Sequence, residues 1–158
     1  MFFSKIDINE VKKMIIRCFD LDEGFTGVTL TPDRIHKVFM DADIALKWEP
    51  IPNWKMYESG EFELSDDELI WSMLKRHNLE SGLLYIINDL ASPNYFDKSA
   101  FMISYDHVEE FVKFEYFELF KRCFFGKGDI IFFKPDDKFI SILHHSGYMT
   151  TYRKLCYV

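Results

Sequence analysis

The C-terminal part of the sequence places the strongest constraint on the fold. From Asp129 onward, three apolar runs alternate with turn sequences, at residues 130–133, 139–143 and 148–152. The turns are Lys-Pro-Asp-Asp-Lys after the first run and Ser-Gly before the last. Aromatic and β-branched residues bounded by Pro, Asp and Gly are typical of strands joined by short turns. We therefore predict an antiparallel β-meander over residues 129–152.

The sequence before this meander favours helices. Apolar residues recur at helical spacing behind three capping-box patterns, Asp7-x-x-Glu10, Ser65-x-x-Glu68 and Asp106-x-x-Glu109. Thr31-Pro32 is a further helix start. We predict helices at about 8–19, 32–45, 66–77 and 107–122, and a short strand at 83–87. Because helices precede the sheet, we predict an α+β fold, with N-terminal helices packed on a C-terminal antiparallel meander, in one globular domain over residues 1–158.

Composition excludes several classes of protein. An apolar fraction of 48%, with 17 Phe, 8 Tyr and 3 Trp, is incompatible with a disordered chain. The net charge of -7 disfavours non-specific binding to nucleic acids or anionic membranes, and suits a cationic partner. The three Cys are far apart and form no zinc or disulfide pattern, and the longest uncharged run is too short to span a membrane. We expect a soluble cytoplasmic protein, a monomer or homodimer, without a metal or cofactor.

The negative charge is concentrated in the middle of the chain. Residues 55–74 contain one basic and six acidic side chains, whereas residues 121–158 contain seven basic and three acidic ones. Asp66 and Asp67 lie in the first turn of a predicted helix, where the helix dipole favours carboxylates. Glu58, Glu61 and Glu63 precede that helix and gain little from its dipole.

Two interpretations of this acidic segment are open. Tyr57 lies among the glutamates, and an acidic loop with aromatic side chains is suited to contact with a basic surface. The same composition is also typical of a loop that is simply solvated. We take the five carboxylates and Tyr57 as candidate partner-binding residues.

Four further aromatic residues are candidates for partner binding. Trp48 and Trp54 flank a Pro-rich loop, and a Trp on such a loop either anchors a partner or covers the core. Phe114 and Phe117 fall outside the apolar face of the helix predicted at 107–122. Either that helix is buried on two sides or these two rings face a partner.

We find no catalytic motif. Residues 144 and 145 are both His, but neighbours in a strand point to opposite faces, so His144 and His145 could not chelate one metal ion. Asp136 and Asp137 are expected in a turn for conformational reasons. An enzyme using His144 and His145 with Asp136 and Asp137 is therefore the weaker alternative, beside a generic interaction domain, and we expect a protein without enzymatic activity.

The small size, acidity, aromatic richness and lack of catalytic motifs resemble the immunity proteins of bacterial toxin–immunity systems, including contact-dependent growth inhibition. The stretch from Asp129 to Asp137 resembles hairpins in such proteins. This resemblance implies an inhibitor that binds a cognate toxin domain, often a basic nuclease, and occludes its active site. It carries over no individual residue.

Overall fold

The computed structural model describes residues 3–21, 37, 39, 46–50, 73–89, 99–111, 113, 129–143 and 148–153. Its strands are β1 (Phe3–Asp7), β2 (Leu46–Pro50), β3 (Leu83–Asp89), β4 (Ser99–Ser104), β5 (Asp129–Lys134), β6 (Phe139–Leu143) and β7 (Tyr148–Arg153). Its helical segments are α1 (Ile8–Phe19), α5 (Val108–Glu110) and the 3-10 turns η2 (Lys75–His77), η3 (Tyr105–His107) and η5 (Pro135–Asp137). No helix in this part of the chain is long and apolar enough to cross a membrane.

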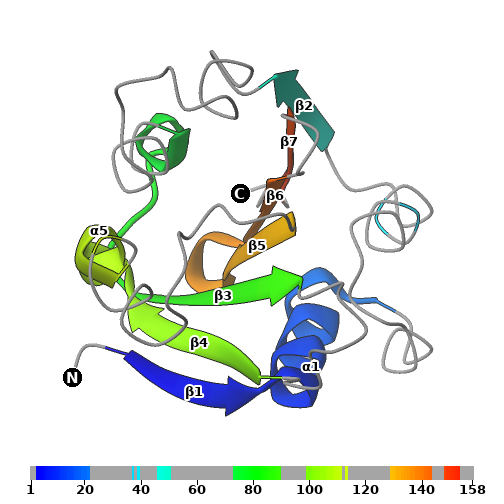
Figure 1. The fold of residues 1–158 in the computed structure, drawn as a ribbon. Helices are drawn as coiled ribbons and strands as arrows, with labels where there is room; N and C mark the ends of the chain where they lie inside the picture. The colour runs from blue at the N-terminus through cyan, green and yellow to red at the C-terminus, as the bar shows by residue number, and fades with distance from the viewer. Residues whose placement is uncertain are drawn as a thin grey trace.

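The seven described strands form one sheet in the order β1-β4-β3-β5-β6-β7-β2. Every neighbouring pair is antiparallel. Figure 1 shows the sheet running from β1 to β2, with β6 and β7 turned away from the direction of β3, as expected from the twist of a large sheet. The two edge strands are β1 and β2, and Pro50 lies in β2, where a missing backbone donor is tolerated.

Both faces of the sheet are apolar. Successive strand residues point to opposite faces, so in β5 Ile131 and Phe133 belong to one core cluster, and Ile130 and Phe132 to the other. All four are almost fully buried. This double burial explains why β5 and β6 are continuous apolar runs instead of alternating ones, a pattern more common in parallel sheets.

Helix α1 supplies one of the two covering layers. Val11, Ile15 and Phe19 recur at helical spacing, are buried, and belong to the core cluster that contains Phe133. Asp7 begins the helix by accepting a hydrogen bond from the backbone N–H of Asn9 at 2.7 Å. Phe19 also packs edge-to-face against Phe39, with ring centroids 4.9 Å apart.

The opposite face is covered by two segments from the middle of the chain. Met73 and Leu74 lie there beside Val108 and Phe111, all in the core cluster that contains Phe132. Figure 1 shows α5 at the end of the sheet where β3 begins and β4 ends. The sheet is therefore the central layer of the described structure.

The structure confirms the α+β class and the predicted strands. The three-stranded meander is present as β5, β6 and β7, and the strand predicted at 83–87 is β3. The meander is part of a larger sheet, however, because β1, β2 and β4 were not predicted as strands. β1 and β2 are short edge strands, where tertiary pairing overrides weak local signals.

The helix predicted at 8–19 is confirmed as α1. The capping box at residue 106 is wrong: the segment continues from β4 through η3 into α5, and neither η3 nor α5 has a side-chain cap. Asp106 accepts hydrogen bonds from the Ser81 hydroxyl instead. Most of the helices predicted at 32–45, 66–77 and 107–122 lies outside the described residues, so the packing of all N-terminal helices on the sheet stays a prediction.

Truncation of Ile15 tests the packing of α1 on the sheet. Ile15→Ala should lower the free energy of unfolding by about 2–5 kcal/mol, because Ile15 is fully buried and its loss leaves a cavity. Lys13→Ala, on the exposed side of the same helix, should change it by about 0.5 kcal/mol or less. Urea denaturation of both variants measures the difference, and equal stabilities would mean that α1 does not cover the sheet.

Candidate functional site

A buried ion pair lies at the end of the sheet where β5 passes into β6. Lys134 is the last residue of β5 and is fully buried, and the side chain of Asp137 in η5 is 6% exposed. The Lys134 Nζ atom is 2.5 Å from Asp137 Oδ2, and neither atom has a hydrogen-bond partner among the described residues, so the contact is an ion pair alone. Removing both charges from water costs several kcal/mol, which only their close pairing offsets. The turn between β5 and β6 is therefore held by charge as well as by its Pro-Asp-Asp sequence.

Arg153 connects this ion pair to the segment that covers the sheet. Its guanidinium lies 3.6 Å from Asp137 Oδ1 and donates a hydrogen bond of 2.8 Å to the backbone carbonyl of His77. The His77 ring also packs on Phe139, with ring centroids 5.1 Å apart. Asp137 thus links β5, β7 and, through Arg153, the end of η2.

Gly82 is required where β3 begins. Its φ of 145° is strained for any other residue, and a Cβ atom there would lie 2.8 Å from Asp136 Oδ2 and 3.2 Å from Lys134 Nζ. Its carbonyl accepts a hydrogen bond of 2.8 Å from the backbone N–H of Tyr105. The start of β3 is therefore in close contact with both η5 and η3.

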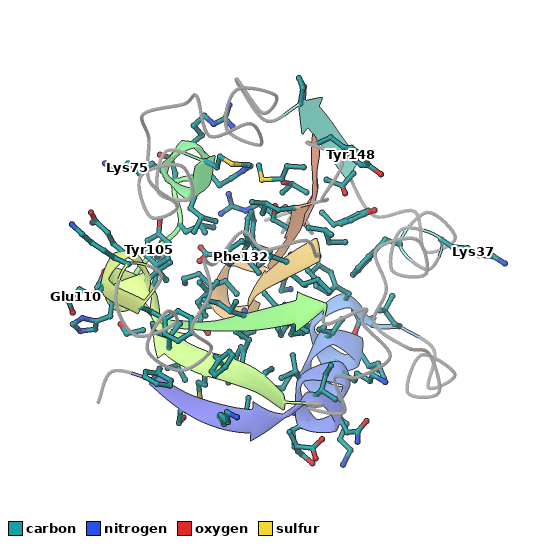
Figure 2. All side chains as sticks on the ribbon, viewed as in Figure 1. Lys37, Lys75, Tyr105, Glu110, Phe132 and Tyr148 are labelled. Carbon is teal, nitrogen blue, oxygen red and sulfur yellow. The ribbon has the colours of Figure 1, made fainter. Side chains whose placement is uncertain are left out.

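Acidic side chains surround this junction on the surface. We define the sheet-end surface as the exposed carboxylates of Glu80, Asp106, Glu109, Glu110 and Asp136. They come from the loop before β3, from η3 and α5, and from η5. Figure 2 shows Glu110 and Tyr105 together at the side of the molecule where β4 ends.

Two of these carboxylates have local contacts. Glu110 lies 3.7 Å from the His107 ring nitrogen, and Asp106 accepts from Ser81 at 3.3 Å. Glu80, Glu109 and Asp136 form no ion pair with another described residue. The nearby cations Lys75, Arg76 and Lys113 each have contacts of their own. These three cations are exposed as well, so this part of the surface carries charges of both signs.

Two buried tyrosines, Tyr85 and Tyr105, have raised pKa values. Burial, with Asp136 as the second cause, raises the pKa of Tyr85 above its usual value. Burial also raises the pKa of Tyr105, followed by the charges of Asp137 and Asp106. Both phenols are therefore neutral at physiological pH, and the stability that they contribute is lost only as pH rises from about 10 through their raised pKa values.

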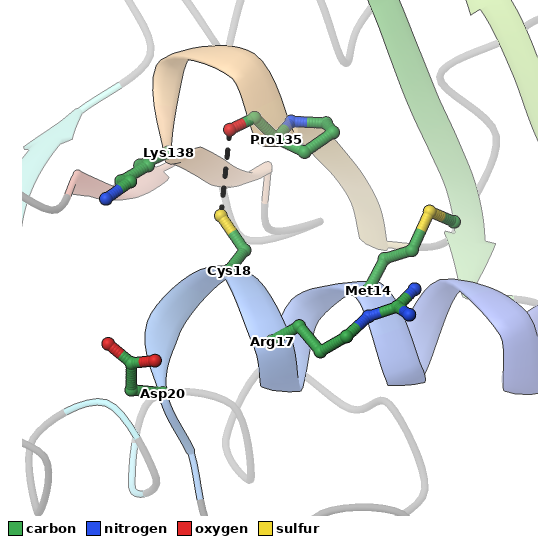
Figure 3. Close-up of a pocket in the computed structure, with 6 residues that line it drawn as sticks. All are labelled: Met14, Arg17, Cys18, Asp20, Pro135 and Lys138. Carbon is green, nitrogen blue, oxygen red and sulfur yellow. Dashed lines mark hydrogen bonds between the residues drawn. The ribbon is translucent and has the colours of Figure 1, made fainter.

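A second feature is a shallow pocket between α1 and η5, with a volume of about 380 Å³. Its walls are Met14, Arg17, Cys18, Asp20, Pro135 and Lys138. The Cys18 thiol is 3.7 Å from the Pro135 carbonyl and donates to it (Figure 3). Arg17 and Lys138 extend to opposite sides of Cys18 in Figure 3, so the two cations do not converge on one point.

Most of the residues named from the sequence lie outside the described part of the chain. Those outside the described residues are Trp54, Tyr57, Glu58, Glu61, Glu63, Asp66, Asp67, Phe114, Phe117, His144 and His145. The backbone of Trp48 lies in the edge strand β2, opposite Thr150 of β7, so this part of the predicted loop is a strand. Asp136 and Asp137 lie in the turn, as predicted, but Asp137 is an ion-pair partner and not only a turn former.

The sequence did not point to Lys134, Arg153 or Gly82. Lys134 belongs to a turn pattern in which a lysine is ordinarily solvated, and Arg153 follows the last predicted strand. The one available signal was the position of Lys134, which shares a face with Ile130 and Phe132 in the alternation of β5. A charged side chain that is buried on an apolar face is stable only when a buried group of opposite charge pairs with it.

We compared the chain with known protein families, curated proteins and solved structures. No protein-family model, no curated protein and no solved structure matches this chain. Within the described ranges, no group of three or more His, Cys, Asp or Glu side chains is arranged to hold a metal ion.

Substitution of Gly82 tests the close approach at the start of β3. Gly82→Ala should lower the free energy of unfolding by about 1–3 kcal/mol, because the new Cβ would meet Asp136 in a strained backbone conformation. The double variant Gly82→Ala with Asp136→Ala should recover the steric part of this loss, and leave the backbone part. Thermal unfolding of the three proteins checks this, and full stability of Gly82→Ala would contradict the geometry.

Removal of one or both partners of the ion pair tests its contribution to stability. Asp137→Ala should destabilise the fold by about 3–5 kcal/mol, because Lys134 would be left buried without its counter-charge. The paired change Lys134→Met with Asp137→Ala should be less destabilising than Asp137→Ala alone, because no unpaired charge then remains buried. A double-mutant cycle in urea measures this coupling, and additive effects would show that the two side chains act independently.

Proposed function

We propose that this protein is an inhibitor of the immunity-protein type, which binds a cationic protein toxin and occludes its active site. The observation that carries the proposal is the sheet-end surface, a set of exposed carboxylates held on a rigid junction in a chain of net charge -7. Complementary charge steers a basic partner toward such a surface and disfavours acidic ones. A fixed frame also lowers the entropy that is lost on binding.

We include the acidic segment at 55–74 in the proposal because of its charge. Its last two residues, Met73 and Leu74, are buried on the sheet face that carries α5. The chain then passes through η2, whose last carbonyl is held by Arg153, to Glu80 in the sheet-end surface. Glu58, Glu61 and Glu63 precede Met73 in the sequence and lie outside the described residues.

We further propose that the partner is a single basic toxin domain, such as a nuclease, met by a monomer or homodimer of this protein in the cytoplasm. The alternative with His144 and His145 acting beside Asp136 and Asp137 has less support. Asp137 precedes β6 and is engaged by Lys134, whereas His144 follows Leu143 at the other end of that five-residue strand. Such a strand is about 17 Å long.

Charge reversal in the acidic segment tests the proposal. Glu58, Glu61 and Glu63 changed together to Lys should slow association with the toxin by roughly tenfold at low salt, because unscreened charges act during encounter. At higher salt the Debye length falls below about 8 Å and the effect should shrink. The partner is obtained by co-purification with this chain as bait, and surface plasmon resonance measures both rates.

Single substitutions supply the controls. Glu80→Lys should slow association more than Glu10→Lys, which makes the same change on α1, away from the sheet-end surface. Removal of an anchor such as Trp54 or Phe117 should act on dissociation instead, at a cost of about 2 kcal/mol. Unchanged association rates at low salt for the triple variant and for Glu80→Lys would place the interface elsewhere.

A further inference from the structure

His77 is a titratable residue enclosed by the junction at the end of the sheet. Its ring packs on Phe139, with ring centroids 5.1 Å apart, and its Nε2 atom is buried from solvent. Its backbone carbonyl accepts the hydrogen bond of 2.8 Å from Arg153. A histidine in an unfolded chain takes up a proton near pH 6.5, so this ring can change its charge within the range of pH met in cells.

Two cations flank the ring on which His77 packs. Phe139 lies opposite Lys134 of β5 on one side and opposite Arg153 of β7 on the other. Side chains of directly opposed residues share a face of the sheet, and their Cβ atoms are about 5 Å apart. The imidazole of His77 therefore lies over a row that carries a positive charge at each end.

The other charges near His77 give the junction little capacity for a further cation. β6, on which the ring packs, has no charged residue. The charged groups of the described residues around His77 are Lys75 and Arg76 on η2, Glu80 in the loop that follows, Lys134 on β5, Asp136 and Asp137 on η5, and Arg153 on β7. Asp137 is the carboxylate inside the junction, and it is already shared by Lys134 and Arg153.

We infer that His77 is a pH-sensitive contact, which holds η2 on the sheet while its ring is neutral and releases η2 when the ring takes up a proton. The protonated ring would place a further positive charge beside Lys134 and Arg153, on an element that already carries Lys75 and Arg76. Burial of the ring disfavours its charged form as well. This inference is independent of the proposed function, because it concerns the attachment of η2 and no partner.

The sign of the effect follows from linkage between proton binding and folding. The folded protein binds the His77 proton less readily than the unfolded chain does, because only the fold brings the ring to Lys134 and Arg153. The unfolded chain therefore holds more protons below about pH 6.5, and stability must fall as the pH falls through this range. Near neutral pH both states have a neutral ring, and the contribution vanishes.

The opening should be confined to a short segment. η2 has three residues, and the described contacts that hold its end are the ring packing on Phe139 and the hydrogen bond from Arg153. Met73 and Leu74, just before η2, are buried in the core. The backbone N–H of Asn78 donates to the Lys75 carbonyl at 3.3 Å, so its hydrogen exchange reports on η2.

NMR of the unaltered full chain measures the protonation of each histidine ring between about pH 8 and 5. His107 is the internal comparison, because its ring is 3.7 Å from Glu110, whose charge favours the protonated form. His77 should take up its proton at a lower pH than His107. Protection of the Asn78 amide, corrected for the intrinsic pH dependence of exchange, should fall as His77 becomes charged.

A variant that keeps the ring packing without the charge provides the second measurement. His77→Phe can still pack on Phe139 but cannot be protonated. Between about pH 7.5 and 5, the equilibrium constant for unfolding should rise roughly tenfold more in the unaltered protein than in His77→Phe, which corresponds to one unit of difference in proton affinity. The matched control His107→Phe should lose at least as much stability in acid as the unaltered protein does.

Two results would overturn the inference. One is a His77 ring that takes up its proton at the same pH as His107 or at a higher pH. The other is an equal loss of stability in acid for His77→Phe and the unaltered protein in urea denaturation. If His77→Phe fails to fold, the NMR titration of the unaltered chain decides the question by itself.

Discussion

The structure depends on the burial of both faces of one antiparallel sheet. Ile131 and Phe133 face the layer that contains α1, and Ile130 and Phe132 face the layer that contains Met73 and α5. Hydrophobic burial is proportional to the apolar area removed from water, so a sheet with two apolar faces is stable only when both are covered. This requirement explains why α1 and the segments around residues 74 and 108, distant in sequence, are all drawn to the same sheet.

At the end of the sheet the chain turns from β5 into β6, and a charged residue of β5 is buried there between the covering layers. Lys134 continues the α5-side row of β5, so its ammonium group is carried into a buried position. Asp137 neutralises it, and Arg153 extends the contact to the carbonyl of His77. One carboxylate thus joins the turn after β5 to the last strand and to the covering layer. Such a network fixes one arrangement of the junction even where its net contribution to stability is small.

The proposed function follows from what this junction presents to solvent. Its buried part is balanced in charge, while Glu80, Asp106, Glu109, Glu110 and Asp136 remain exposed around it. Exposed carboxylates alone contribute little to affinity, but they set the rate and the selectivity of encounter with a cationic surface. The proposed inhibition of a basic protein therefore rests on these exposed carboxylates and on the junction that holds them.

The sequence by itself determined the local features. The turns around Pro135 and the apolar runs of β5, β6 and β7 specify strands through their own composition, and the spacing of Val11, Ile15 and Phe19 specifies α1. The acidity of the chain is likewise a property of the sequence, and the cationic partner that it suggests stays a prediction. These signals are readable because each one is contained within a few consecutive residues.

Only the tertiary structure decided which residues come together. β1 and β4 have weak local signals and become strands because the sheet supplies their partners. Lys134, Asp137 and Arg153 are ordinary charged residues in the sequence, and become a buried network because β5, β6 and β7 end at the same place. Gly82 is required at the start of β3 because of η5 and η3, which are distant along the chain. Contacts between residues this far apart in the sequence leave no periodic pattern, so only the tertiary structure shows them.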